Sequence, residues 1–194
     1  SHTHFSGTGH SDLGDLLIMP TVGTLQLNPG TADNPDGGYR SRYAHETETA
    51  KPGYYEVTLA DYGIKAQLTT TQRVGVHKYT YPKQSDKQHL ILDLIHGIYN
   101  YDGKVLWTQL RVENDTLLTG YRITNGWARV NYTYFAISFS KPIQQYGCVE
   151  KGKVDYKGGY GKFDMTHNFP DMGGRKLVTY FDFDPKAGSE LEVK

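Results

Sequence analysis

Short segments in which apolar and polar residues alternate recur along most of this chain. Residues 64–69 read Ile-Lys-Ala-Gln-Leu-Thr, which places apolar side chains on one face of an extended strand and polar ones on the other. Residues 89–95 are almost continuously apolar, so we expect a strand that is covered on both faces. The other segments with strand character are residues 54–59, 75–81, 105–112, 117–124, 128–139 and 176–183, with the start of one more at 190–194.

Turn-forming residues separate these segments. Pro52-Gly53 and Asp61 to Gly63 predict tight turns, and Asn125-Gly126 predicts a short hairpin between residues 117–124 and the strand that follows Trp127. Residues 144–175 are rich in Gly, Lys and Asp, and we expect loops or short edge strands there. Many short strands joined by tight turns predict an all-β fold, an antiparallel β-sandwich of about ten to twelve strands.

The composition supports β structure and removes several classes of function. The 194 residues include 16 tyrosines and 22 glycines, which favours β structure within one domain. The 21 basic and 21 acidic residues balance, so nothing in the charge argues for nucleic acid or an anionic membrane as partner. No apolar run approaches the roughly 20 residues that a membrane-spanning helix needs. The lone Cys148 excludes an internal disulfide, and we expect it to be a buried hydrophobe.

The densest polar chemistry lies in the first fifteen residues, which hold three histidines, five hydroxyl side chains and three glycines. Such a segment suits a polar ligand pocket, because glycine lets a ligand approach the backbone and the side chains donate and accept hydrogen bonds. A metal site and the bracing of a buried loop are the alternatives. The candidate ligand contacts are His2, His4, Ser6, Thr8 and His10.

His45 and Glu46 form a second candidate, just before the Pro52-Gly53 turn. Glu46 and Glu48 would share a face of a strand, and inverting glycoside hydrolysis uses two carboxyl groups about 6.5–9.5 Å apart. We favour contact of His45 and Glu46 with a sugar or a partner domain over a catalytic pair.

Two tryptophans and several aspartates are weaker candidates. Trp127 or Trp107 could stack on the apolar face of a sugar, although burial in a core is the commoner fate of tryptophan. Oxygen ligands that calcium prefers come from four aspartates, with solvated turn carboxylates as the alternative. These aspartates are Asp164, Asp171, Asp182 and Asp184.

The start of the chain resembles the N-terminal domain of glycoside hydrolase family 92, and we call residues 1–10 the first motif. The resemblance starts with Ser-His-Thr-His-Phe-Ser-Gly-Thr-Gly at residues 1–9 and continues with Asp-Leu-Gly-Asp at 12–15 and Met19-Pro20. His10 departs from the pattern, since many family members carry cysteine there. Further matches follow in order at residues 43–48, 52–57, 68–73, 120–122, 127–128 and 134–135.

This resemblance implies part of an exo-acting α-mannosidase that is commonly α-1,2-specific, calcium-dependent and inverting. Family members have an N-terminal supersandwich-like β-sandwich packed on an (α/α)6 barrel that carries the catalytic carboxylates and most of the calcium site. We therefore expect residues 1–194 to be most of one β-sandwich domain, truncated at both ends, without catalytic residues or a metal site and inactive alone.

The resemblance also implies mannose-containing glycans and the helical catalytic domain as partners. It places the enzyme outside the cytoplasm of a bacterium, as a secreted, periplasmic or cell-surface protein. In this picture the present domain walls one side of the sugar pocket through the first motif, His45, Glu46 and Trp127. Two alternatives remain open: a non-catalytic carbohydrate-binding module, which would need an exposed aromatic platform, and a purely structural interface domain.

Overall fold

The computed structural model describes residues 14–150 and 168–194, and these ranges hold thirteen strands, three short 3-10 helices and no α-helix. The 3-10 helices are η2 (Pro35–Gly37), η3 (His45–Thr47) and η4 (Pro185–Ala187). The strands are β1 (Leu17–Val22), β2 (Thr49–Lys51), β3 (Tyr54–Leu59), β4 (Ile64–Thr70), β5 (Gly75–Thr80), β6 (Gln88–Asp93), β7 (Val105–Asn114), β8 (Leu117–Thr124), β9 (Asn131–Ser138), β10 (Ile143–Glu150), β11 (Asp171–Gly174), β12 (Leu177–Phe183) and β13 (Glu190–Val193). No helix in the described ranges is long and apolar enough to cross a membrane.

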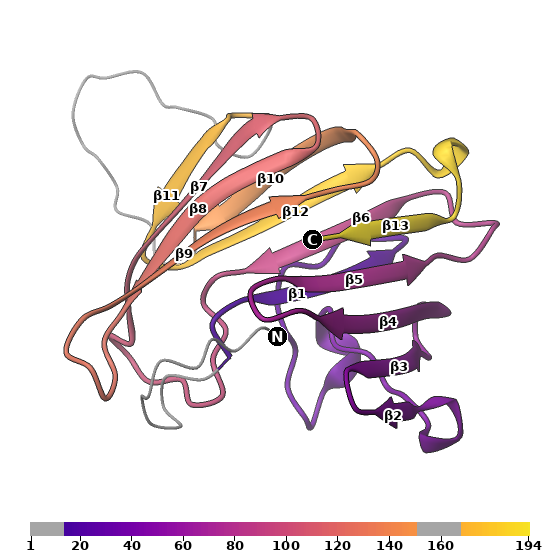
Figure 1. The fold of residues 1–194 in the computed structure, drawn as a ribbon, viewed down its shortest axis with the longest axis horizontal. Helices are drawn as coiled ribbons and strands as arrows, with labels where there is room; N and C mark the ends of the chain where they lie inside the picture. Colours follow the sequence, from indigo (N-terminus) through magenta and orange to yellow (C-terminus); the bar gives the residue numbers. More distant parts are fainter. Residues whose placement is uncertain (1–13, 151–167) are drawn as a thin grey trace.

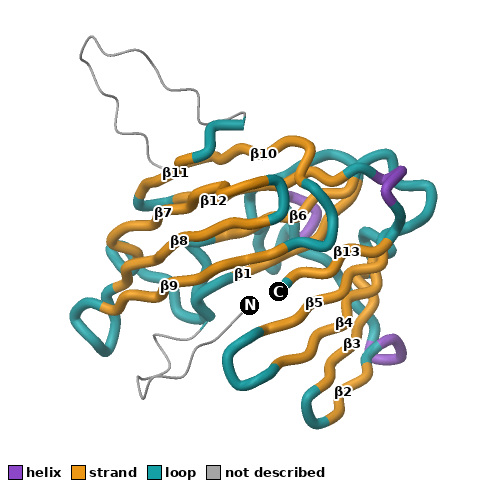
Figure 2. Tube along the Cα trace, turned by 45° about the horizontal axis from the view of Figure 1, so that its top comes forward, coloured by secondary structure: helices purple, strands orange, loops and turns teal. Residues whose placement is uncertain are grey.

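The strands form three antiparallel sheets, in the orders β1-β6-β12-β10, β11-β7-β8-β9 and β13-β5-β4-β3-β2. The last two are joined where Phe139 pairs with Val193 and where Ser138 and Lys194 exchange two backbone hydrogen bonds. The first sheet packs against them, and one apolar core contains side chains from all three sheets, such as Leu92, Leu110 and Leu191. Figures 1 and 2 show this layered arrangement, which confirms the predicted all-β sandwich.

Strand β6 is buried along its whole length, as its apolar run predicts. Leu90 and Leu92 face the main core, whereas Ile91 belongs to a second cluster with Tyr39 and Val178. The irregular segment after β1 covers that second face through Leu25, Leu27 and Tyr39. The first sheet is therefore shielded on both sides, once by the other sheets and once by an irregular segment.

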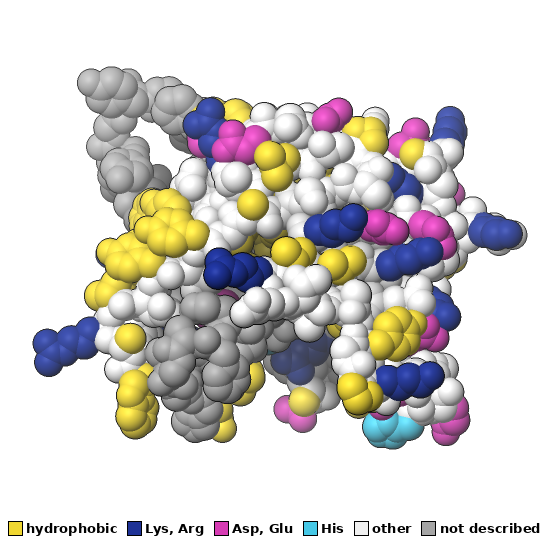
Figure 3. Space-filling view, viewed as in Figure 1, with side chains coloured by type: hydrophobic (Ala, Val, Ile, Leu, Met, Phe, Trp, Pro, Cys, Tyr) yellow, Lys and Arg dark blue, Asp and Glu magenta, His cyan; other side chains and the backbone are white. Residues whose placement is uncertain are grey.

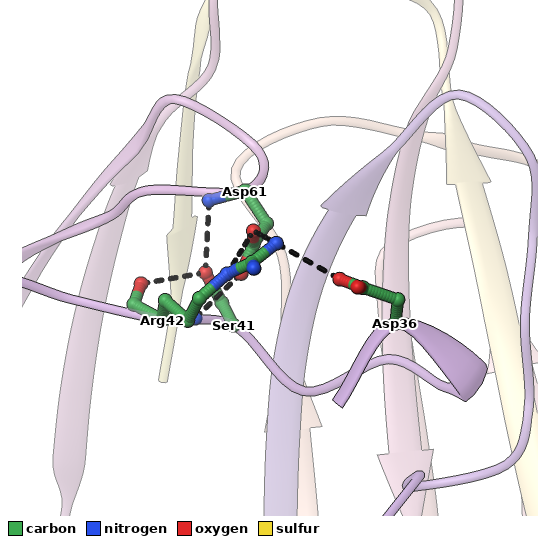
Figure 4. A network of polar contacts seen from close by, with 4 residues as sticks. All are labelled: Asp36, Ser41, Arg42 and Asp61. Carbon is green, nitrogen blue, oxygen red and sulfur yellow. Dashed lines mark hydrogen bonds and ion pairs between the residues drawn. The ribbon is translucent and has the colours of Figure 1, made fainter. Parts of the chain in front are cut away.

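A group of polar contacts holds the end of this segment to the β3–β4 turn (Figure 4). The Arg42 guanidinium donates to Asp61 at 2.5 and 2.8 Å and to Asp36 at 2.8 Å, and the Asp61 amide donates to Ser41 at 3.2 Å. Hydrogen bonds from Arg42 lower the pKa of Asp61. These charges are exposed or partly exposed and satisfy one another, so we assign them a structural role.

The β8–β9 connection differs from the prediction. Asn125-Gly126 does not make a two-residue hairpin, because β8 ends at Thr124 and β9 begins only at Asn131. The backbone of Asn125 bonds instead to the β6–β7 connection, accepting from the Tyr101 hydroxyl at 2.5 Å and donating to the Lys104 carbonyl at 2.7 Å. In the region 144–175, β10 and β11 are both edge strands.

Gly120 supplies a test of how tightly the sheets pack. It faces inward on β8, and a Cβ there would lie 2.4 Å from the Gln109 carbonyl oxygen and 2.6 Å from the Phe135 ring. We expect Gly120→Ala to lower the free energy of unfolding by about 1–3 kcal/mol, because the backbone cannot move aside locally. Gly173→Ala, whose Cβ would make ordinary 3.5 Å contacts, is the matched control for urea denaturation. Equal midpoints for the two variants would contradict the packing argument.

Candidate functional site

The predicted contacts of the first motif lie outside the described residues; they are His2, His4, Ser6, Thr8 and His10. The described chain begins at Gly14, shortly after this motif, and Gly14 and Asp15 are buried. Strand β1 then runs antiparallel to β6, with Leu17 opposite Asp93. The residues that follow the motif therefore lie at the end of the sandwich where β6 ends, and the site is built from that end.

Four charged side chains are buried at this end: Asp15, Asp93, Lys104 and Arg122, each 1–4% exposed. Charged groups are almost never buried this completely unless they have partners. The partners here are largely backbone groups of the connection between β6 and β7, as the following contacts show. Such concentrations of buried charge are more common at functional sites than in the remainder of a sandwich core.

Arg122 projects inward from β8 and connects two segments that are far apart in sequence. Its Nη1 donates to the Asp15 carbonyl oxygen, and Nη2 lies 3.5 Å from the Ile95 carbonyl oxygen. Its Nε is buried with no hydrogen-bond partner within the described parts of the chain. Burial lowers the pKa of the guanidinium below its usual value, with Asp15 and Asp93 acting in the opposite direction. Arg122 thus holds the start of β1 against the β6–β7 connection.

Asp93 is the last residue of β6, and its carboxylate accepts hydrogen bonds from the residues that follow it. Its Oδ1 accepts hydrogen bonds from the Ile95 amide at 2.7 Å and the His96 amide at 3.0 Å, while Oδ2 accepts from the Tyr39 hydroxyl at 2.6 Å. Burial, then the charge of Asp93 and this hydrogen bond, raise the pKa of Tyr39. One carboxylate therefore fixes the β6–β7 connection and the irregular segment that covers the sheet.

An open pocket of about 630 Å³ lies beside these groups, within the range of about 300–1,000 Å³ that is usual for ligand sites. Arg40, Asp93, His96, Lys104 and Arg175 contribute to its lining. The Lys104 ammonium donates to the Tyr99 carbonyl oxygen at 2.8 Å. Burial lowers the pKa of His96, which leaves a neutral imidazole at neutral pH that can both donate and accept. Asp93 and Lys104 are already engaged, so the groups of this lining that can bond a polyhydroxylated ligand are His96 and the exposed Arg40 and Arg175.

The expectation that Glu46 and Glu48 share one face of a strand is wrong, because His45–Thr47 forms the 3-10 helix η3 and β2 begins only at Thr49. Glu48 accepts from the Tyr55 hydroxyl at 2.6 Å and contacts the His45 ring at 2.8 Å, and these two hydrogen bonds lower its pKa. Glu48 is thus held as a carboxylate. His45 and Glu46 are exposed, as a surface contact requires.

The tryptophans are more exposed than the core interpretation predicts. Trp127 is 79% exposed in the β8–β9 connection and Trp107 is 42% exposed on β7. The β8–β9 connection and strand β2 lie on opposite sides of Figure 1. The structure therefore does not bring Trp127 together with His45 and Glu46 in the described fold.

The aspartates offered as calcium ligands have other roles where they are described. Asp182 lies 2.6 Å from Nδ1 of the buried His89, whose Nε2 lies 2.9 Å from the Gly23 carbonyl oxygen. Asp184 caps η4 by accepting from the Lys186 amide at 2.8 Å. Asp164 falls outside the described residues. Within residues 14–150 and 168–194 no three His, Cys, Asp or Glu side chains are grouped as a metal site would need, so these residues do not fit calcium.

Sequence reasoning missed the buried charges. Arg122 could have been found, because in an alternating strand it lies on the same inward face as Leu118 and Gly120. A charged side chain on a buried face requires hydrogen-bond partners. Asp93 had a weaker signal as the lone charge in an apolar run. Lys104 and His96 had none, since their burial depends on how the β6–β7 connection folds back on the sheets.

Comparison with known proteins supplies the family context. Residues 1–194 match the model of the glycosyl hydrolase family 92 N-terminal domain. The GH92 α-mannosidase BT3965 from Bacteroides thetaiotaomicron, solved in complex with mannoimidazole, is 40% identical over 98% of this chain with a TM-score of 0.82. The GH92 inverting mannosidase BT2199 of the same organism is 25% identical over 92%, with a TM-score of 0.67. This chain spans only 24% and 21% of those two chains. No curated protein matches.

Proposed function

Because this chain belongs to the glycosyl hydrolase family 92 N-terminal domain family, we propose that it forms one wall of the sugar pocket of a calcium-dependent, inverting exo-α-mannosidase that acts on α-1,2-linked mannose. The chemistry is proposed to take place on a helical catalytic domain of the same protein, on which this domain packs. The enzyme would act on mannose-containing glycans outside the bacterial cytoplasm.

One observation supports the proposed role of this domain: four buried charges gather where the described chain begins, at Gly14 and Asp15. Arg122 and Asp93 fix the start of β1 and the β6–β7 connection to each other, and the polar pocket opens beside them. A rigidly held polar surface positions a sugar at little cost in ordering, and small errors of position reduce rates strongly. His2, His4, Ser6, Thr8 and His10 are the proposed contacts from the first motif.

The division of labour follows from the chemistry of inversion. An acid protonates the leaving oxygen while a carboxylate activates water on the opposite face of the sugar, in a single displacement. Glu48 is already engaged by Tyr55 and His45 and is held ionised, so it does not suit the acid role. The residues of this domain would instead orient hydroxyl groups and exclude water. The described residues offer no set of ligands for calcium, which the proposal assigns to the helical domain.

The decisive measurement is mannose release from α-1,2-linked mannobiose by the 194-residue chain, with calcium and with a chelator. We expect no release from the folded chain under either condition. Calcium-dependent release would place the catalytic carboxylates in this domain and would contradict the proposal.

The pocket wall is tested in a chain in which this domain continues into the helical domain. We expect His4→Ala and His96→Ala each to lower kcat/KM on mannobiose by about 10- to 100-fold through misplacement of the sugar. Lys83→Ala, at an exposed position in the β5–β6 connection, is the control. Unchanged kcat/KM in both histidine variants would show that this domain does not touch the substrate.

A further inference from the structure

The outward face of β8 and β9 carries a row of tyrosines that the proposed pocket does not use. Strand register places Tyr121 beside Tyr134 and Ile123 beside Tyr132, and it places Trp107 of β7 beside Ile123. We call Tyr121, Tyr132, Tyr134 and Trp107 the aromatic face. Hydrophobic side chains gather over these strands at the left of Figure 3.

The rings of the aromatic face lie next to one another. Those of Tyr132 and Tyr134 are nearly parallel, with 10° between their planes and 6.3 Å between their centroids, whereas the ring of Tyr121 lies 5.9 Å from that of Tyr134 and is tilted by 50° to it. Tyr132 and Tyr134 remain 53% and 72% exposed, and Trp107 leaves 42% of its surface exposed. Gly173 lies beside Trp107, since a Cβ there would make an ordinary 3.5 Å contact with the indole. Two nearly parallel and largely exposed rings thus lie beside each other on this face.

The charge and the hydroxyl groups of this face restrict what can cover it. The neighbouring outward positions, Gln109 and Ile123, are uncharged, and Arg111 further along β7 lies near Glu113 and Asp171. Within the described ranges no hydrogen bond engages the hydroxyl groups of Tyr121, Tyr132 or Tyr134. A protein partner would have to desolvate these three hydroxyls and find an acceptor for each. A neutral sugar offers its apolar C–H face to the rings and its own hydroxyl groups to the phenol oxygens, so it matches the face in charge and in polarity.

We propose that the aromatic face binds a neutral oligosaccharide by stacking, with consecutive sugar rings over Tyr132 and Tyr134. That the sugars are α-linked mannoses rests on the proposed function; the stacking surface itself rests on the geometry of the rings. The face would hold a longer glycan on the domain and raise the affinity for polymeric over short substrates.

The test is titration of the 194-residue chain with a neutral α-mannan oligosaccharide of at least four sugars, followed by calorimetry and by the fluorescence of Trp107 in a Trp127→Phe background. We expect saturable binding and a Kd raised about tenfold by Tyr134→Leu, with a smaller change for Tyr134→Phe, which keeps the ring.

The Tyr132→Ala, Tyr134→Ala double variant should lose measurable binding. Near-UV circular dichroism shows whether each variant is folded. Tyr43→Ala is the matched control, because Tyr43 is 52% exposed and lies outside the face.

Three results would overturn the inference. These are an absence of binding at millimolar oligosaccharide, equal affinity of the double variant and the unsubstituted chain, and a loss of affinity in Tyr43→Ala alone. Self-association of the chain, or association with the separate helical domain, that depends on Tyr132 and Tyr134 would assign the face to protein contact instead. Failure here leaves mannobiose hydrolysis untouched, so it is distinguishable from failure of the proposed pocket.

Discussion

Arg122→Ala is expected to lower the free energy of unfolding by about 3–5 kcal/mol, because it truncates a fully buried charged side chain. Arg122 is 1% exposed, and its side chain fills the space between the start of β1 and the β6–β7 connection. Truncation leaves a cavity and removes the donor to the buried Asp15 carbonyl. Both losses act on the end of the sandwich that the proposed pocket occupies.

Urea denaturation monitored by fluorescence and by circular dichroism measures this effect. Arg129→Ala, which removes the same side chain from an exposed position in the β8–β9 connection, should change stability by less than about 0.5 kcal/mol. Arg122→Lys keeps the charge but not the planar donors, so we expect an intermediate loss. If Arg122→Ala were as stable as Arg129→Ala, the connection between β1 and the β6–β7 segment would not depend on this side chain.

Most strands could be predicted because their own sequence shows either an alternation of apolar and polar residues or a continuous apolar run. The alternation in residues 64–69 matches β4, and the continuous apolar run at 89–95 matches β6, which is buried on both faces. Strand β2 is only three residues long and polar, so it has no such period. The Asn125-Gly126 signal correctly predicts that β8 and β9 pair as a hairpin but not the length of their connection. The backbone of Asn125 bonds to Tyr101 and Lys104 of the β6–β7 connection, and these tertiary contacts cannot be read from a local turn signal.

The candidate site could be predicted only in part, for a physical reason. A histidine-rich and hydroxyl-rich motif is visible in one short stretch of sequence, and so is a family resemblance. The buried charges where the described chain begins, Asp93, Lys104 and Arg122, are separated along the sequence. They meet only because β1 pairs with β6 and because Arg122 lies on the inward side of β8. Local patterns also gave the wrong conformation for His45–Thr47, where the side chain of Thr47 bonds to the Ala44 carbonyl oxygen at 2.8 Å and helps to close a 3-10 turn.

Asp93 and Tyr39 should show a strong energetic coupling. We expect Asp93→Ala to lower the free energy of unfolding by about 2–5 kcal/mol. The substitution leaves the buried Tyr39 hydroxyl without its acceptor and removes the acceptor of the Ile95 and His96 amides. Tyr39→Phe should cost about 1–2 kcal/mol, since it deletes one hydrogen bond without a cavity.

A double-mutant cycle separates the two roles of this carboxylate. In the double variant no buried hydroxyl is left without an acceptor, so the loss of stability should be smaller than the sum of the two single losses by about 1–2 kcal/mol. Asp102→Ala, in the same connection and 99% exposed, should leave stability unchanged. Hydrogen exchange at the Ile95 and His96 amides should quicken in Asp93→Ala and stay slow in Tyr39→Phe, because only the first variant removes their acceptor. Strict additivity, or fast exchange in Tyr39→Phe, would mean that Asp93 does not join the irregular segment to the pocket as a single unit.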